Sequence, residues 1–401
     1  MAAYEDPARV LTALTRASHL STFEDLPTLV ASHATRAGLG RVAIFLADLQ
    51  QDVLRELTGH GPDAGHGGEE LRIDATLAGR AFQRGLGGAV SDGRGRHWVP
   101  VLDGTERLGV LRVDAVPTGG ADGKAREDLA SLLGLLLVSK RAYSDSYARL
   151  SRTRPMSPSA EMQWTLMPPQ VFSNGRVTIA AVMEPAYETA GDAFDYALAG
   201  QTARLALFDA MGHDTAAGLT ANLAVATCRS HRRRGASLAE TGAAIEAALM
   251  EQFHRDRYAT GVIADLDLGT GQLSWVNYGH PPPVLIRGGR WTTILKCPPT
   301  HPLGTDLGLT HTVCREQLEP GDRLLFHTDG ITEARDAKGR LFGLDRFVDF
   351  LVRHHADEVS LPETLRRLVH SVLDYHDGVL DDDATVLCCA WHGPGGQGAA
   401  V

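Results

Sequence analysis

AGDAFDYALAGQTARLALFDAMGHD, residues 190–214, is the stretch on which the fold of the C-terminal half depends. Apolar side chains alternate with small or polar ones on both of its arms, which is typical of half-buried β-strands. Gly200 lies between the arms, where a glycine readily adopts the positive φ of a tight turn. If Gly200 and Gln201 form a two-residue loop, Asp192 lies directly opposite Asp209 in the resulting hairpin.

Asp192 and Asp209 would repel each other in such a hairpin. Directly opposed side chains on paired strands have Cβ atoms roughly 4.5–5.5 Å apart. Two carboxylates at that separation need a counter-charge or a shared proton. A divalent cation supplies the counter-charge, because hard cations take oxygen ligands. Two interpretations stay open for the hairpin alone: a metal site, or a solvated turn that the acids merely mark.

The composition is that of an ordinary globular protein with more than one domain. The chain of 401 residues, 43% of them hydrophobic, is long enough for two or three domains of roughly 150 residues. Its formal net charge of −10 disfavours nucleic acid and anionic membranes as partners, since both are bound through Lys and Arg. The basic run RSHRRR, residues 229–234, reads as a solvated helix end.

Targeting signals and a disulfide framework are not expected. No apolar run approaches the ~20 residues that cross a bilayer, and the N-terminus lacks the layout of a signal peptide. The odd number of cysteines and their spacing indicate no disulfide framework; they are Cys228, Cys297, Cys314, Cys388 and Cys389. We therefore expect a reduced, cytoplasmic protein.

The N-terminal part of the chain reads as an α+β domain over residues 8–142. Its motifs LAGRAF (77–82), WVPVLDG (98–104) and LGVL (108–111) resemble those of a GAF sensor domain. The resemblance implies either a small-molecule ligand or a domain that only packs or dimerises, because a fold does not dictate a function.

A leucine-rich helical pattern follows, within the linking segment 125–159. Its stripe includes Leu129, Leu133 and Leu137, and such a stripe indicates either core or a seam between helices. One interpretation is a homodimer formed through this linker helix. The polar, proline-containing run SRTRPMSPS, residues 151–159, indicates the domain boundary.

Residues 160–391 read as an α-β-β-α sandwich, two antiparallel sheets flanked by helices. Strands in hairpin order with helices inserted in pairs predict this architecture. The hydrophobic pattern predicts helices at 215–233, 238–253, 342–355 and 361–375, and strands at 177–183, 194–198, 205–209, 260–268, 273–278, 284–287, 311–315, 323–328 and 384–391. The tail, residues 393–401, is expected to be disordered.

Further aspartates lie at strand ends. Asp329 follows the strand-like RLLFHT, and the run 381–383 precedes the last strand. A hydrolytic two-metal site needs several oxygen ligands around ions about 3.5–4 Å apart. A single Asp-Gly at a strand end indicates only a turn, but four such groups together favour a metal site.

Residues 160–391 resemble the PPM (protein phosphatase 2C-like) metal-dependent serine/threonine phosphatases, in the bacterial SpoIIE-like branch. Seven motifs match in order: AEMQWTLMP (160–168), PA followed by AGDAFD (185–195), FDAMGH (208–213), NYGHPP (277–282), PLG (302–304), GDR followed by TDGITEA (321–334), and DDAT (382–385).

The resemblance implies two Mn²⁺ or Mg²⁺ ions and assigns their ligands by position. The implied ligands are Asp192, Asp209, the carbonyl of Ala210, Asp329 and Asp382. Residues implied to support these ligands are Asp195, His213 and Asp383.

Three positions depart from the pattern of the family. Ala190 replaces the first Gly of Gly-Gly-Asp, Asp214 replaces the Gly after the motif histidine, and Tyr278 replaces a small residue. None of them removes a ligand side chain. We therefore expect these departures to change metal affinity or substrate choice relative to the family, and not to abolish the metal site.

The resemblance implies hydrolysis of phosphoserine or phosphothreonine by a water activated between the ions. It also implies a substrate among phosphorylated anti-sigma-factor antagonists (STAS-type) or similar signalling proteins, under control of the N-terminal domain. Two alternatives stay open. One is a non-catalytic, phosphatase-like scaffold; the other is a nucleotidyl cyclase, which would leave Asp329 and Asp382 without a role.

Overall fold

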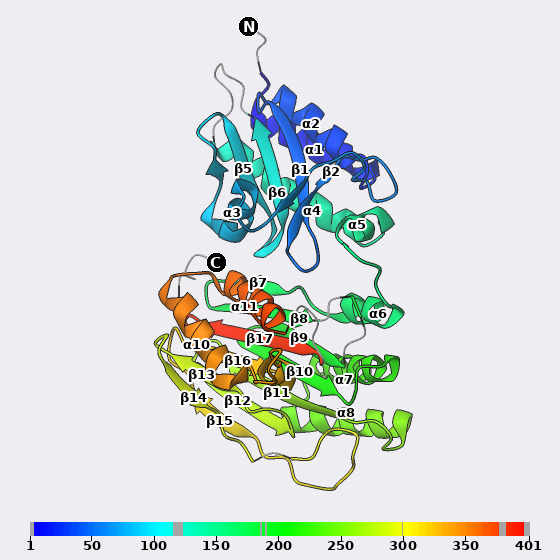
Figure 1. Ribbon diagram of the computed structural model, residues 1–401, viewed down its shortest axis with the longest axis vertical. Helices are drawn as coiled ribbons and strands as arrows, with labels where there is room; N and C mark the ends of the chain where they lie inside the picture. Colours follow the sequence, from blue (N-terminus) through cyan, green and yellow to red (C-terminus); the bar gives the residue numbers. More distant parts are fainter. Residues whose placement is uncertain are drawn as a thin grey trace. The chain divides into compact units, whose positions relative to one another are not determined.

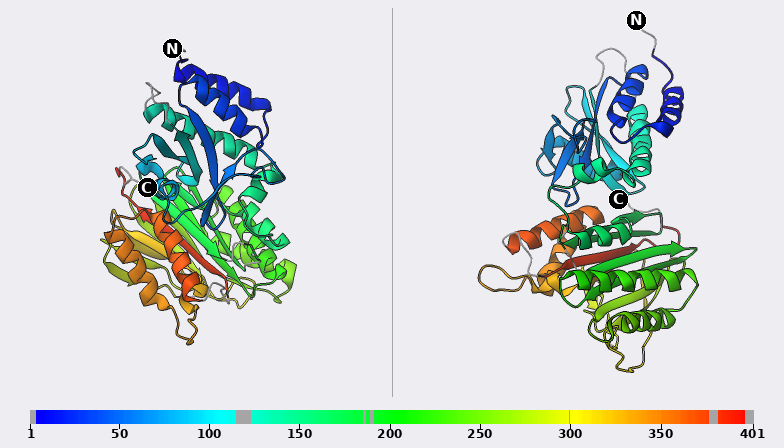
Figure 2. Two further views of the ribbon diagram at one scale, coloured as in Figure 1. Left: turned by 45° about the horizontal axis from the view of Figure 1, so that its top comes forward. Right: turned by 90° about the vertical axis from the view of Figure 1, so that its right-hand side faces the viewer.

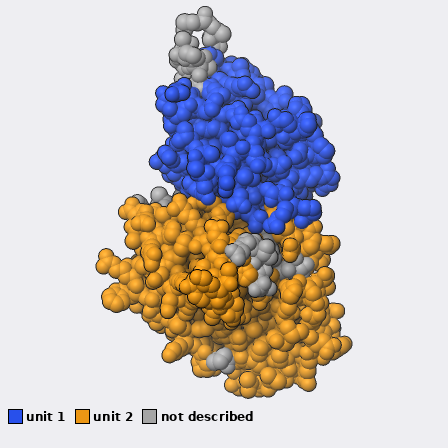
Figure 3. All heavy atoms as spheres, viewed as in Figure 1, with its two compact units in different colours: residues 1–155, 400–401 blue, residues 156–399 orange. Residues whose placement is uncertain are grey.

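The structure is a computed structural model that describes residues 4–114, 123–184, 187–188, 191–298, 300–376 and 382–396. The chain divides after Pro155 into two compact units (Figure 3). This division falls within the polar break expected at 151–159. Parts of three segments named above lie outside the described residues. They are Pro185-Ala186 and Ala190 in the hairpin motif, Asp381 in the run before the last strand, and residues 397–401 of the tail.

Unit 1 is built on one antiparallel sheet in the order β3-β2-β1-β6-β5-β4 (Figure 1). Its strands are β1 (Arg41–Ala47), β2 (Val53–Leu57), β3 (Glu70–Arg72), β4 (Val90–Ser91), β5 (Arg96–Asp103) and β6 (Glu106–Asp114). Its helices are α1 (Pro7–Ala17), α2 (Leu26–Arg36), α3 (Leu77–Arg84), α4 (Gly123–Arg141) and α5 (Asp145–Leu150), with 3-10 turns at Ser18–Leu20 and Gly85–Gly87. Helices α1, α2 and α4 cover one face of the sheet, and α3 covers the other.

The leucine stripe of α4 lies in the core of unit 1, so its interpretation as a dimer seam is corrected. Leu129, Leu133 and Leu137 are buried against α1, α2 and the sheet. The helix also ends at Arg141, and a separate short helix, α5, begins at Asp145. A sheet face needs a cover, and an apolar stripe that supplies it is no longer free to pair with a second chain.

Unit 2 contains two antiparallel sheets stacked between helices (Figure 2). One sheet has the order β15-β12-β11-β10-β9 and the other β14-β13-β16-β17-β8-β7. The strands are β7 (Val171–Ser173), β8 (Val177–Glu184), β9 (Asp192–Ala199), β10 (Thr202–Ala210), β11 (Ala259–Asp267), β12 (Gln272–Tyr278), β13 (Val284–Arg287), β14 (Trp291–Ile294), β15 (Cys314–Gln317), β16 (Arg323–His327) and β17 (Ala384–Trp391). The helices are α6 (Pro158–Leu166), α7 (Thr215–Arg233), α8 (Leu238–Phe253), α9 (Asp329–Glu333), α10 (Gly343–Ala356) and α11 (Leu361–Tyr375).

Helices α7 and α8 pack on the first sheet, and α9, α10 and α11 pack on the second. Local signals set where the first pair begins: Asp214 caps α7 by accepting from the N–H of Ala217, and Ser237 and Glu240 form a capping box at α8. The core between the sheets continues under α7 and α8, and a second cluster lies under α10 and α11. The expected two-sheet arrangement with flanking helices is confirmed for unit 2.

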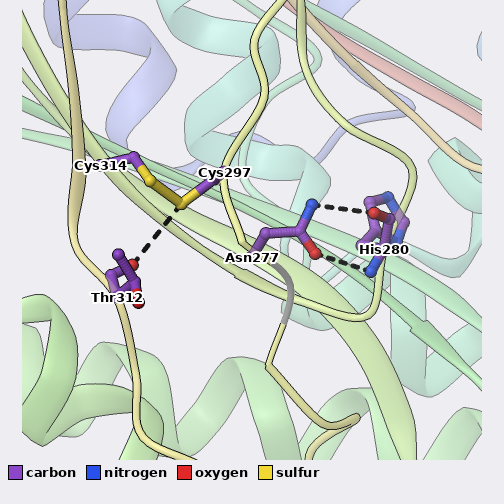
Figure 4. The surroundings of a disulfide bond; sticks show 5 residues. All are labelled: Asn277, His280, Cys297, Thr312 and Cys314. Carbon is purple, nitrogen blue, oxygen red and sulfur yellow. Dashed lines mark hydrogen bonds between the residues drawn. A yellow bond between two sulfur atoms is a disulfide. The ribbon is translucent and has the colours of Figure 1, made fainter.

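The structure contains a disulfide that the cysteine count did not predict. Cys297 follows β14 and bonds to Cys314 at the start of β15, with 5.8 Å between their Cα atoms (Figure 4). The expectation of no disulfide was wrong because an odd count still permits one bond. The three remaining cysteines are buried thiols: Cys228, Cys388 and Cys389.

One position that departs from the family is accommodated inside this fold. Tyr278 is fully buried. A Cβ atom added to Gly242 of α8 would lie only 1.6 Å from the Tyr278 hydroxyl oxygen. The glycine therefore leaves the room that the large side chain needs. Within the described part of the chain, no helix is both long and apolar enough to cross a membrane.

Candidate metal centre

The hairpin β9–β10 has the register that its turn predicts. Thr202 pairs with Ala199 across the two-residue loop, and Asp209 consequently pairs with Asp192. Gly200 has a φ of +59°, as the tight turn requires. Asp192 is 1% exposed, so one of the two opposed carboxylates lies fully inside the protein.

The second sheet brings its own aspartates to the same place. β16 and β17 are antiparallel neighbours, and His327 pairs with Val386. Asp329 follows the end of β16, whereas Asp382 and Asp383 precede the start of β17, so all three lie at one edge of the pair.

Thr328 joins the two sheets at this edge. Its hydroxyl donates to Oδ2 of Asp192 at 2.7 Å and accepts from the N–H of Thr385 at 2.9 Å. Gln163 of α6 adds a second contact, because its Nε2 donates to the backbone carbonyl of Asp192 at 2.9 Å. Thr328 thus holds β9 against the second sheet, and Gln163 holds it against α6. The sequence motifs did not single out either residue for that role.

Two glycines permit the close approach of the backbone segments. A Cβ on Gly191 would lie 2.5 Å from the carbonyl oxygens of both Ala210 and Gly212. The N–H of Gly191 donates to the Asp383 carboxylate, which ties the start of β9 to the start of β17. A Cβ on Gly330 would lie 1.9 Å from the carbonyl oxygen of Asp383. The glycines beside Asp192 and Asp329 are thus needed for packing.

Burial and mutual repulsion raise the pKa values of these carboxylates. Burial raises the pKa of Asp192 well above its usual range, and repulsion from Asp209 and Asp383 raises it further. Burial, followed by repulsion from Asp329 and Asp382, raises the pKa of Asp209 to about 7. The pKa of Asp383 is raised to about 7, chiefly by burial. Burial and the neighbouring Asp382 also raise the pKa of Asp329.

The site is rich in negative charge and poor in positive charge. Among the described residues, no Lys or Arg forms an ion pair with Asp192, Asp209, Asp329, Asp382 or Asp383. Within that same part of the chain, no three His, Cys, Asp or Glu side chains form a ready-made group that could hold an ion. The donor chemistry nevertheless fits hard cations, since the site offers carboxylate oxygens whose repulsion a divalent charge would relieve.

Among the described residues, no hydrogen bond or ion pair joins Asp195 or His213 to the carboxylates of the cluster. Asp195 is 2% exposed on the opposite face of β9, where it pairs with Arg229 at 2.8 Å and Arg232 at 2.9 Å. The sequence had suggested that the basic run is a solvated helix end. That prediction was wrong for these two arginines, because they bind a buried carboxylate. His213 is exposed between β10 and α7. The neighbouring Asp214 caps α7 and pairs with Arg257 at 2.7 Å.

Comparison with known proteins relates the same part of the chain to phosphatases. Residues 199–392 match the family model of the stage II sporulation protein E (SpoIIE). The phosphoserine phosphatase RsbU of Bacillus subtilis is 22% identical over 229 residues, which are 57% of this chain and 68% of RsbU. Protein IcfG of Synechocystis sp. is 26% identical over 132 residues, 32% of this chain. The SiaA-PP2C domain of Pseudomonas aeruginosa aligns with a TM-score of 0.49 and 20% identity, over 57% of this chain and 93% of that domain. The chain covers only 20% of the length of IcfG.

Proposed function

We propose that residues 199–392, which match the SpoIIE family model, form a serine/threonine phosphatase domain. It hydrolyses phosphoserine or phosphothreonine on a signalling protein, with two Mn²⁺ or Mg²⁺ ions bound. One observation carries the proposal. Strand ends from two sheets present a cluster of mutually repelling carboxylates without a basic partner among the described residues. Asp192 and Asp383 are buried, Asp209 and Asp329 are half-buried, and Asp382 is exposed.

Five groups would hold the ions: the carboxylates of Asp192, Asp209, Asp329 and Asp382, and the carbonyl of Ala210. Bound cations would activate a water and neutralise the charge of the phosphoryl oxygens. The chain itself positions the ligands. Thr328 orients Asp192 through its hydroxyl, and Asp383 accepts from Gly191 to hold the backbone beside it. His213 and Asp195, implied as supporting residues, have no such contact with the cluster.

We propose a phosphorylated STAS-type protein, or a similar signalling protein, as the substrate. The family match and the likeness to RsbU support this choice of class. We further propose that unit 1 is a GAF-like sensor domain that controls the activity of unit 2. Its own sheet, helices and core are consistent with a separate domain of that kind.

The proposal is tested by incubating the full chain with phosphoserine and phosphothreonine peptides, and with phosphorylated STAS proteins, in the presence and absence of Mn²⁺. We expect phosphate release that requires the metal and falls at least a hundredfold in Asp209→Asn, because that change removes a charged ligand. Asp349→Asn serves as the matched control, since Asp349 is 67% exposed on α10 and pairs with Arg353 of the same helix.

Metal-independent release, or full activity in Asp209→Asn, would contradict the proposed mechanism. Metal binding without any turnover would instead support a non-catalytic scaffold. Phosphodiester formation from a nucleoside triphosphate would favour a cyclase.

A further inference from the structure

His280, in the NYGHPP motif, is buried beside the candidate metal centre and has no role in the proposed function. Its side chain is 5% exposed. Asn277 holds the loop in place through the backbone of residue 280: its Nδ2 donates to the His280 carbonyl and its Oδ1 accepts from the His280 N–H, each at 2.8 Å (Figure 4). Since both bonds use the backbone, the imidazole is left free to act on another group.

That other group is Thr260, which pairs with Asp209 across strands β10 and β11. Directly paired residues on antiparallel strands point to the same face. The hydroxyl oxygen of Thr260 lies 2.8 Å from Nδ1 of His280. The Thr260 hydroxyl therefore lies on the same face as the Asp209 carboxylate, and it lowers the pKa of Asp209 against the larger effect of burial. Asp209, Thr260 and His280 therefore form a chain of three side chains.

Donor and acceptor chemistry gives this chain a direction. When Asp209 is ionised, as binding a cation requires, it only accepts hydrogen bonds, so a Thr260 hydroxyl that serves it points its single proton to Asp209. The Thr260 oxygen can then only accept from His280, which requires the proton on Nδ1. Burial lowers the pKa of His280 to about 3, so the ring is neutral.

The other ring nitrogen, Nε2, is the alternative position for the proton. The backbone of His327 lies near enough to act on the pKa of His280. Yet Nε2 of His280 makes no hydrogen bond to any of the described residues. The contact with Thr260 is thus the hydrogen bond through which the ring acts.

We propose that Thr260 and His280 are positioning residues for Asp209, and that the NYGHPP motif exists to orient this carboxylate toward bound cations. The proposal rests on the metal centre of the proposed function. A neutral imidazole suits the task because it supplies a fixed donor without adding a charge that would compete with the ions. Hydrogen-bonded neighbours of metal ligands typically contribute 10–100-fold in metal affinity.

The test is Mn²⁺ binding by calorimetry to the full chain and its variants, independent of any substrate. Thr260→Val keeps the shape but removes the hydroxyl, and we expect a tenfold or greater loss of affinity. Thr260→Ser restores the hydroxyl and should bind within threefold of the wild type. His280→Leu should weaken binding about tenfold, whereas His280→Asn, with an amide donor near the Nδ1 position, should recover part of the loss.

Thr178→Val is the matched control, because Thr178 also contacts a histidine: its hydroxyl lies 2.9 Å from Nε2 of His392. Thr178 is six residues from the end of β8 that adjoins the site, roughly 20 Å along the strand. Its loss should lower stability without changing Mn²⁺ affinity. The tautomer gives a second readout, since ¹⁵N spectra of histidine-labelled protein should show the proton of His280 on Nδ1.

Wild-type affinity in Thr260→Val, or a proton on Nε2 of His280, would overturn the proposal. If the wild-type chain binds no Mn²⁺, the metal centre fails and the positioning role fails with it. If it binds Mn²⁺ but releases no phosphate, the phosphatase proposal fails while the affinities of the variants still decide the role of Thr260 and His280.

Discussion

Individual aspartates carry the electrostatic character of this protein. Asp209 and Asp383 each have a pKa near 7, and Asp192 and Asp329 are shifted in the same direction. Ions and protons therefore compete for the same oxygens. Metal binding requires ionised carboxylates, so Mn²⁺ affinity should rise as the pH increases through 7.

The pKa of Asp209 predicts how the metal-free protein responds to pH. The folded form holds a proton between pH 4 and 7 that the unfolded form releases, so the contribution to stability is present below pH 4 and is lost as pH rises through 7. The Asp209→Asn variant has no carboxyl group to ionise at this position, so it does not lose this stability as the pH rises. In EDTA, we expect the variant to gain on the wild type from pH 5 to pH 8, by at most about 2.7 kcal/mol in the free energy of unfolding.

Urea unfolding at several pH values measures this difference. The exposed change Asp349→Asn should give a difference that does not vary with pH. A constant difference between Asp209→Asn and the wild type would show that the carboxylate titrates normally.

At the scale of elements, the loop between β14 and β15 supports the strands that carry the candidate site. The N–H of Thr300 donates to the carbonyl of Asn277 at 3.0 Å, and Leu303 pairs with Ala259 at the start of β11. Glu246 of α8 accepts from the N–H groups of Gly304 and Asp306. The disulfide closes this loop at its base.

We predict that the Cys297–Cys314 bond stabilises unit 2. Closing a loop of this length, with a sequence separation of 17 between the cysteines, contributes about 3 kcal/mol by restricting the unfolded chain. The double change Cys297→Ser and Cys314→Ser should lower the free energy of unfolding by that amount, and a reductant should do the same to the wild type.

Thiol counting provides the control. Without reductant, the denatured wild-type protein should show three reactive thiols, and the double variant should be insensitive to reductant. Five thiols in the non-reduced wild type would contradict the bond.

At the scale of the whole molecule, each unit has a hydrophobic core of its own. The clusters of unit 1 contain no residue beyond Leu150, and those of unit 2 contain none before Met167. Units with separate cores are able to unfold separately.

We therefore predict two transitions in calorimetry, of which Mn²⁺ raises only one. At a concentration of 100 times its Kd, the ion adds about 2.7 kcal/mol to the stability of unit 2. Leu133→Ala should lower the transition that Mn²⁺ leaves unchanged, and Leu368→Ala should lower the other, because both leucines are fully buried, one in each unit. A single transition that responds to both substitutions would show that the units unfold together.

The elements whose causes are local could be predicted from the amino-acid sequence. The alternation on the two arms and the Gly200 turn predicted the β9–β10 pairing, down to Asp192 opposite Asp209. Helices α7 and α8 and strand β17 were predicted with their observed ends. The short edge strand β14 was missed because all four of its residues are exposed. Such a strand shows no alternation of apolar and polar residues in the sequence.

Contacts between residues far apart in the sequence became visible only in the tertiary structure. The hydrogen bond from Thr328 to Asp192 joins positions 136 residues apart, and the contact of Gly191 with Asp383 joins positions 192 apart. The same holds for Asp195, which faces the arginines of α7, for the leucines of α4 in the core of unit 1, and for the pair Cys297–Cys314. Periodicity and turn chemistry act over a few residues, whereas these contacts depend on how two sheets and their helices pack. For this reason the carboxylates of the candidate metal centre could be predicted from the sequence. Only the fold shows that they lie together without a basic partner among the described residues.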